Sequence, residues 1–176
     1  MLSDILLRLP WLPLLVLLGA VAVGPFIGAA LLRHRRVLTG LMVATLAGAL
    51  LLTLYPERAP TVEMGCAVEW PYLSATSVET LANVLLFVPV GLLVGVRLRH
   101  PLIGFGVGVL LSALIEGLQA VVLEIGRACD TGDLVTNTAG AAIGALLAFA
   151  ALRMPHQRDP RGRNTDRPNA VRSDIH

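Results

Sequence analysis

The stretch LIGFGVGVLLSALIEGLQAVVL, residues 102–123, contains a single charged residue, Glu116. A helix of this length, rising ~1.5 Å per residue, is long enough to cross the ~30 Å hydrocarbon core of a bilayer. Other apolar runs of similar length lie on either side of it, at residues 11–32, 37–54, 79–96 and 134–152. The sequence therefore predicts an all-α fold, a polytopic bundle of about five transmembrane helices.

The composition supports this fold class. Of the 176 residues, 55% are hydrophobic and only 15% are charged, whereas a soluble domain usually has about 25% charged residues. The apolar run at residues 11–32 is longer than the ~7–15 residues typical of a signal peptide, so we expect it to remain as a helix. We predict four parts: two transmembrane helices (residues 1–54), an outer loop (55–78), a three-helix core (79–152) and a disordered basic cytoplasmic tail (153–176).

The arginines predict the orientation. Lysine is absent, and 11 of the 14 arginines fall in the three segments that follow the first, third and fifth predicted spans. Basic residues concentrate in cytoplasmic loops, which predicts an N-terminus outside and a C-terminus inside a bacterial cytoplasmic membrane. The aromatic residues Trp11, Tyr55, Trp70 and Tyr72 all fall near the predicted outer boundary, where amphipathic rings favour the headgroup level.

The two cysteines, Cys66 and Cys129, both fall on the predicted outer side. An oxidising compartment permits a disulfide there, although the sequence does not show whether the two residues come close enough. A catalytic thiol is less favoured, because all four histidines fall on the predicted inner side. We expect neither a metal site nor a cofactor, and the membrane-embedded character of the chain leaves nucleic acid out as a partner.

Polar residues recur within the apolar spans. In the span at residues 102–123, Ser112, Glu116 and Gln119 have i, i+4, i+7 spacing and share one helix face. Asn83 and Asn137 each lie about one turn inside the outer end of their own spans. Ionisable groups inside a membrane are costly and usually face the bundle interior. These side chains are therefore predicted to meet at one depth.

Two acidic residues also have an ordinary structural interpretation. Thr76 and Glu79 fit a capping box at the start of the third span. Asp133 is suited to cap the fifth span. The candidate polar cluster, including the adjoining loop, consists of Asn83, Ser112, Glu116, Gln119, Arg127, Asp130, Asp133 and Asn137.

Two interpretations of this cluster remain open. It is either a buried network that locks the helices together, for example through Arg127 paired with Glu116 or Asp130, or a site open to the outer surface. Other residues in the same spans have structural roles: Pro89 should kink its helix. Small residues permit close helix packing, and those at candidate contacts are Gly91, Gly140 and Gly144.

Three blocks of the sequence together resemble the VanZ-like family: NVLLFVPVGLL (83–93), SALIEGLQ (112–119) and R-x-x-D-x-x-D-x-x-x-N-T-x-G-A-x-x-G (127–144). They occur in the family's order and with no departure at the matching positions, whereas the first two spans match only in being apolar. The resemblance implies a polytopic membrane protein whose namesake is associated with resistance to the glycopeptide teicoplanin. It does not imply an established biochemical activity.

Three functions are compatible with these observations. The protein could act at the outer leaflet on lipid-linked wall precursors or on amphiphilic, teicoplanin-type glycopeptides, with Arg127 meeting an anionic headgroup. It could be a membrane enzyme for a polyprenyl-phosphate-type lipid, with Glu116 as general acid or base and Asp130 and Asp133 holding a divalent cation. It could also be a non-catalytic assembly subunit. Membrane lipids are expected partners in each case.

Overall fold

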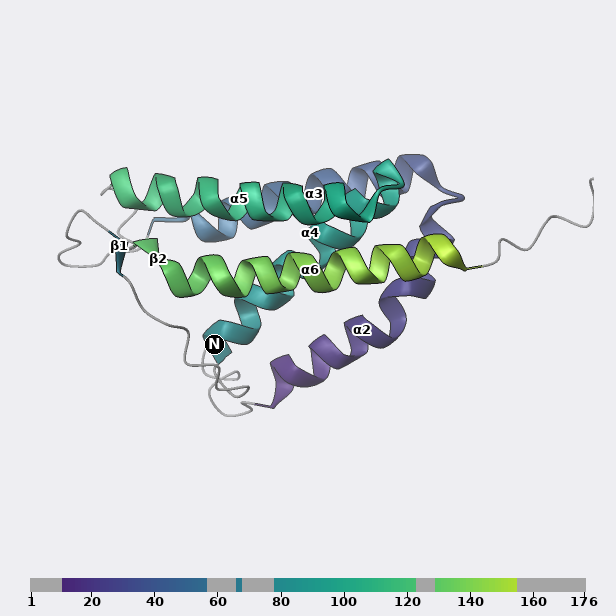
Figure 1. The fold of residues 1–176 in the computed structure, drawn as a ribbon, viewed down its shortest axis with the longest axis horizontal. Helices are drawn as coiled ribbons and strands as arrows, with labels where there is room; N and C mark the ends of the chain where they lie inside the picture. Colours follow the sequence, from purple (N-terminus) through teal and green to yellow (C-terminus); the bar gives the residue numbers. More distant parts are fainter. Residues whose placement is uncertain (1–10, 57–65, 68–77, 123–128, 155–176) are drawn as a thin grey trace, which may run out of the picture.

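The computed structural model describes residues 11–56, 66–67, 78–122 and 129–154. Within these residues it contains five long helices and a two-stranded parallel sheet at one end of the bundle (Figure 1). All five helices are long and apolar enough to cross a membrane, which confirms the predicted fold class. The elements are α2 (Leu12–Leu31), α3 (Arg35–Thr53), β1 (Cys66–Ala67), α4 (Val78–Leu98), α5 (Pro101–Val121), β2 (Cys129–Asp130) and α6 (Thr131–Arg153).

Local sequence explains the tight turn between α4 and α5. The N–H of His100 donates to the carbonyl of Gly95 at 3.0 Å, and the N–H of Arg99 donates to that of Val96 at 3.2 Å. This is the Schellman arrangement of a helix C-terminus. Pro101 then occupies the first turn of α5, where its missing N–H costs no helical hydrogen bond. The two helices consequently run antiparallel.

The alternating helices give the bundle two chemically different ends. We call the end where α4 and α6 begin and α5 ends the acidic end, because it carries all the carboxylates among the described residues: Glu79, Glu116, Asp130 and Asp133. We call the opposite end, where α3 and α5 begin, the basic end. It carries every arginine of the described residues: Arg33, Arg35, Arg36, Arg97, Arg99 and Arg153.

Helix α4 lies at the centre of the bundle. In its most apolar 18-residue window 61% of the residues are buried, compared with 11% in α2. In Figure 1, α5 and α6 run side by side and α2 crosses obliquely. The peripheral helices instead expose large apolar side chains, such as Leu51 at 71% and Leu102 at 72%. This distribution suits a lipid environment, in which exposed leucines carry no hydration cost.

Glycines set how closely the helices approach. A Cβ on Gly144 would overlap the carbonyl oxygen of Val88, and one on Gly140 would overlap that of Val84. On α4, a Cβ at Gly91 would overlap the carbonyl oxygen of Ala141. The backbones of α4 and α6 are thus in direct contact, as happens where small residues face each other in membrane proteins.

Several sequence-based predictions concern features other than the five helices. Helix α4 continues on both sides of Pro89, and the predicted kink remains a prediction, as does the inside–outside orientation. The predicted tail after Met154, most of the 55–78 loop with Trp70 and Tyr72, and the capping residue Thr76 lie outside the described residues.

Candidate functional site

One contact of the polar cluster joins α4 to α6. The side-chain amide of Asn83 donates from Nδ2 to Oδ1 of Asp133 at 2.6 Å. The two residues are 50 positions apart in the sequence, and each lies within about two turns of the beginning of its helix. The distance is shorter than the usual range of about 2.7–3.2 Å for N–H···O hydrogen bonds. This pair therefore fixes the relative depth of α4 and α6.

A second contact, deeper in the bundle, joins α5 to α6. Nδ2 of Asn137 donates to the hydroxyl oxygen of Ser112 at 3.1 Å, and these residues are only 2% and 0% exposed. The other end of the Asn137 amide, Oδ1, is buried and has no hydrogen-bond partner in the described part of the chain. Buried polar atoms are almost always paired, so this oxygen is an exception among the described residues.

Glu116 provides a third contact of the cluster. Its Oε2 accepts from the backbone N–H of Asp130 at 3.0 Å, and its side chain is 6% exposed. The contact ties the buried face of α5 to β2 and the start of α6. Glu116 thus stabilises the approach of the chain to α6.

The helix cap differs from the prediction. Asp133 was expected to cap the last helix, but α6 begins at Thr131 with Asp130 as its N-cap. The Asp130 backbone is extended, and its Oδ1 accepts from the N–H of Gly132 at 2.8 Å. The earlier prediction is wrong because the helix begins directly after β2, which places Asp133 in the first turn, facing Asn83.

Gln119 lies on the same buried face as Ser112 and Glu116, but its partner is on a different helix. Its Nε2 donates to the backbone carbonyl oxygen of Thr53 at 2.9 Å. The C-terminal carbonyls of a helix lack intrahelical donors, so Gln119 satisfies one of those of α3. No sequence pattern points to Thr53, since a backbone acceptor cannot be recognised by residue type.

The cysteines lie beside this cluster. β1 and β2 pair in parallel with Cys66 opposite Cys129. Cys129 is 3% exposed and disulfide-bonded, and Cys66 is the only other cysteine of the chain. The bridge anchors the segment before α4 next to the start of α6. Arg127, the expected cation of the cluster, lies outside the described residues.

The described members of the cluster include both donors and acceptors of hydrogen bonds. Asn83, Gln119 and Asn137 donate from their amide nitrogens. Glu116, Asp130 and Asp133 contribute carboxylates, and Asn137 contributes a carbonyl oxygen that has no partner among the described residues. Within residues 11–56, 66–67, 78–122 and 129–154, no three His, Cys, Asp or Glu side chains gather closely enough to hold a metal ion. Carboxylate and amide oxygens can accept hydrogen bonds from hydroxyl, amide or ammonium groups.

A double-mutant cycle tests the Asn83–Asp133 contact. We expect Asn83→Ala and Asp133→Ala to be coupled by about 1–2 kcal/mol, near the upper end for interhelical hydrogen bonds in membranes. The measurement is the free energy of unfolding in detergent of both single variants and the double variant. Gln119→Ala combined with Asp133→Ala is the control, because Gln119 binds α3. Equal coupling in the two cycles would contradict the assignment.

Comparison with known proteins identifies the family of the chain. The model of the VanZ/LLP1 family matches residues 42–152, which is more than half of the chain and includes α4, α5 and α6. Searches among curated proteins and among solved structures found no match. The matched region contains all the described members of the polar cluster and the glycines through which α4 and α6 make contact. The chain is therefore a membrane protein that belongs to the VanZ/LLP1 family.

Proposed function

We propose that this protein acts at the outer leaflet of the bacterial cytoplasmic membrane, where its acidic end binds a lipid-linked wall precursor or a teicoplanin-type lipoglycopeptide. The family's association with teicoplanin resistance supports a role in the cell envelope. The arginine distribution supports an outward-facing acidic end. The binding partner has a lipid chain for the membrane and polar groups for the cluster.

The observation that carries the proposal is the Asn137 amide oxygen, which has no partner among the described residues and lies in the same cluster as two carboxylate-bearing contacts. A cluster that served only to lock the helices would be expected to satisfy its own buried atoms. Glycopeptides and lipid-linked wall precursors both carry the hydroxyl and amide donors that the carboxylate and amide oxygens of this cluster would recognise. Apolar helix surfaces next to the cluster would accommodate the attached acyl or prenyl chain.

The test is Glu116→Gln in cells exposed to teicoplanin. The wild-type protein, expressed in a susceptible bacterium, should raise the inhibitory concentration, and Glu116→Gln should remove most of this protection. A hydrogen bond to a charged group contributes about 1.5–3 kcal/mol, so its loss should weaken ligand binding by about tenfold or more. Binding of purified protein to teicoplanin and to a lipid-linked wall precursor should show the same loss.

Glu79→Gln is the matched control. Glu79 is also a glutamate at the acidic end, but its side chain is exposed, so its replacement should leave protection unchanged. The amount of each variant in the membrane is measured in parallel, which separates loss of function from loss of protein. Full protection by Glu116→Gln at the wild-type protein level would contradict the proposal, as would wild-type protein that protects no better than an empty vector.

A further inference from the structure

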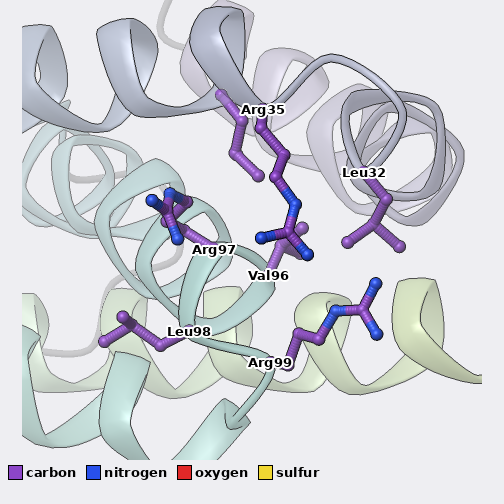
Figure 2. Close-up of a pocket in the computed structure, with 7 residues that line it drawn as sticks. Leu32, Arg35, Val96, Arg97, Leu98 and Arg99 are labelled. Atoms are coloured by element: carbon purple, nitrogen blue, oxygen red, sulfur yellow. The ribbon is translucent and has the colours of Figure 1, made fainter.

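Three arginines surround a small pocket at the basic end, far from the polar cluster. The pocket has a volume of about 110 Å³, and the guanidinium-bearing residues lining it are Arg35, Arg97 and Arg99. Figure 2 shows the side chain of Arg35 extending from α3 toward the end of α4, between those of Arg97 and Arg99. Residues from two helices and the turn after α4 thus bring three positive charges to one place.

One of these side chains is held in position. Nε of Arg97 donates to the hydroxyl oxygen of Thr39 at 2.9 Å, and this hydroxyl donates to the carbonyl oxygen of Arg35 at 2.9 Å. The contact leaves the two terminal nitrogens of the Arg97 guanidinium for another acceptor. Arginine presents these nitrogens as a planar fork that fits two oxygens of a phosphate.

The electrostatics of this end are unbalanced within the described residues. All four carboxylates of the described ranges lie at the acidic end, on the other side of the bundle. Arg35 is the first residue of α3, where the positive end of the helix dipole disfavours a cation and favours an anion. An anion in the pocket would compensate both the guanidinium groups and the helix end.

The backbone conformation of Arg99 also supports an anion site at this pocket. Its φ is +56°, in the left-handed region, and the Schellman turn there usually has glycine at this position. An arginine is less favourable than glycine in this conformation because of its Cβ. The turn directs the Arg99 side chain back toward the pocket, which glycine could not do.

The volume of the pocket and its other lining residues indicate what kind of ligand would fit. A volume of about 110 Å³ corresponds to a few water molecules at ~30 Å³ each, which suits a phosphate group better than a complete headgroup. The remaining lining is apolar: Leu32, Leu38, Val96 and Leu98. The pocket also lies at the ends of helices that are long and apolar enough to cross a membrane, which is where lipid headgroups are expected.

We infer that Arg35, Arg97 and Arg99 form a binding site for the phosphate of an anionic phospholipid in the leaflet at the basic end. The apolar residues contact the glycerol and upper acyl region, and the arginines bind the phosphate oxygens. This site is separate from the polar cluster, and it does not depend on the function proposed above. By the arginine distribution, the leaflet is the cytoplasmic one.

The test is thermal unfolding of the purified full-length protein in detergent. We expect phosphatidylglycerol to raise the melting temperature at low concentration, whereas phosphatidylcholine with the same acyl chains has little effect. In Arg35→Gln/Arg99→Gln, about tenfold more phosphatidylglycerol or more should be needed for the same shift. Arg35→Lys/Arg99→Lys keeps the charge but loses the fork, so an intermediate effect is expected.

Arg33→Gln/Arg36→Gln is the matched control, since these two arginines are exposed at the same end but do not line the pocket. Equal weakening by the control variant would show general attraction of lipid to positive charge and would overturn the site. Equal stabilisation by both lipids would also overturn it. Inorganic phosphate is the final arm: stabilisation by phosphate but not by phosphatidylglycerol would overturn the lipid as its source.

Discussion

Gly144→Ala is expected to lower the free energy of unfolding by about 3 kcal/mol, at the upper end of the usual 1–3 kcal/mol for overpacking. The added Cβ would overlap the carbonyl oxygen of Val88, with the N of Leu92 at 2.7 Å and the Cα of Gly91 at 3.0 Å. The oxygen of Val88 and the nitrogen of Leu92 take part in the hydrogen bonding of α4. All three atoms belong to the backbone, so no side chain can rotate away to make room. The helices α4 and α6 would have to separate.

This separation would also disturb the polar cluster, because the Asn83–Asp133 contact joins the same two helices. Gly106→Ala is the control: apart from its own stretch of helix, no atom of the described residues lies within 4 Å of a Cβ at Gly106, and alanine is the better helix former by about 1 kcal/mol. The measurement is unfolding in detergent by denaturant or heat. Similar stability of the two variants would show that α4 and α6 are not in the close contact described here.

Loss of the disulfide is expected to have the second large effect. Cys129 is buried and bridged, and it is 63 positions from Cys66 in the sequence. Bridges that close long loops typically contribute about 2–4 kcal/mol. We therefore expect Cys66→Ser/Cys129→Ser, or reduction of the wild type, to lower the free energy of unfolding by about this amount.

The double variant supplies the control, because a reducing agent should change the stability of the wild type and leave the variant unaffected. Mass spectrometry of wild-type protein alkylated directly in intact membranes should find both thiols blocked from reaction. An oxidised bridge in growing cells would also support an outward-facing acidic end, since cytoplasmic thiols are kept reduced. Free thiols in membranes prepared without reductant would contradict both the bridge and this orientation.

The boundaries of the helices were predicted closely where local sequence determines them. Pro101 and the basic residues before it separate α4 from α5, and the run at residues 102–123 corresponds to α5 at Pro101–Val121. The start of α6 was placed three residues late, at 134 instead of Thr131. Two aspartates compete to cap this helix, and the choice of Asp130 depends on the extended strand β2 before it, which pairs with a distant segment.

The candidate site was predicted as a set of residues but not as a set of contacts. The spacing of Ser112, Glu116 and Gln119 identified their common face, and all three are buried. Their partners, however, lie on three separate elements. Helical spacing fixes which side chains share a face, while the neighbour that this face meets depends on how the helices are rotated against one another.

The arginines, too, were predicted as a set of residues but not as a set of contacts. From the sequence they indicate orientation only, because positive residues accumulate on one side of many membrane proteins. The structure brings Arg35 beside Arg97 and Arg99, although more than 60 positions separate the first from the others. That proximity requires α3 to pack along α4, which the sequence did not predict.

The sequence by itself determined that the chain forms membrane-spanning helices, how many there are and roughly where each begins and ends. Lipid imposes these features locally, since every backbone polar group must be paired within its own helix. Only the tertiary structure decided which polar groups meet, that the Asn137 amide oxygen has no partner among the described residues, and that three arginines share a pocket. These depend on the rotation and depth of each helix, which are set by backbone contacts at glycines such as Gly91 and Gly144.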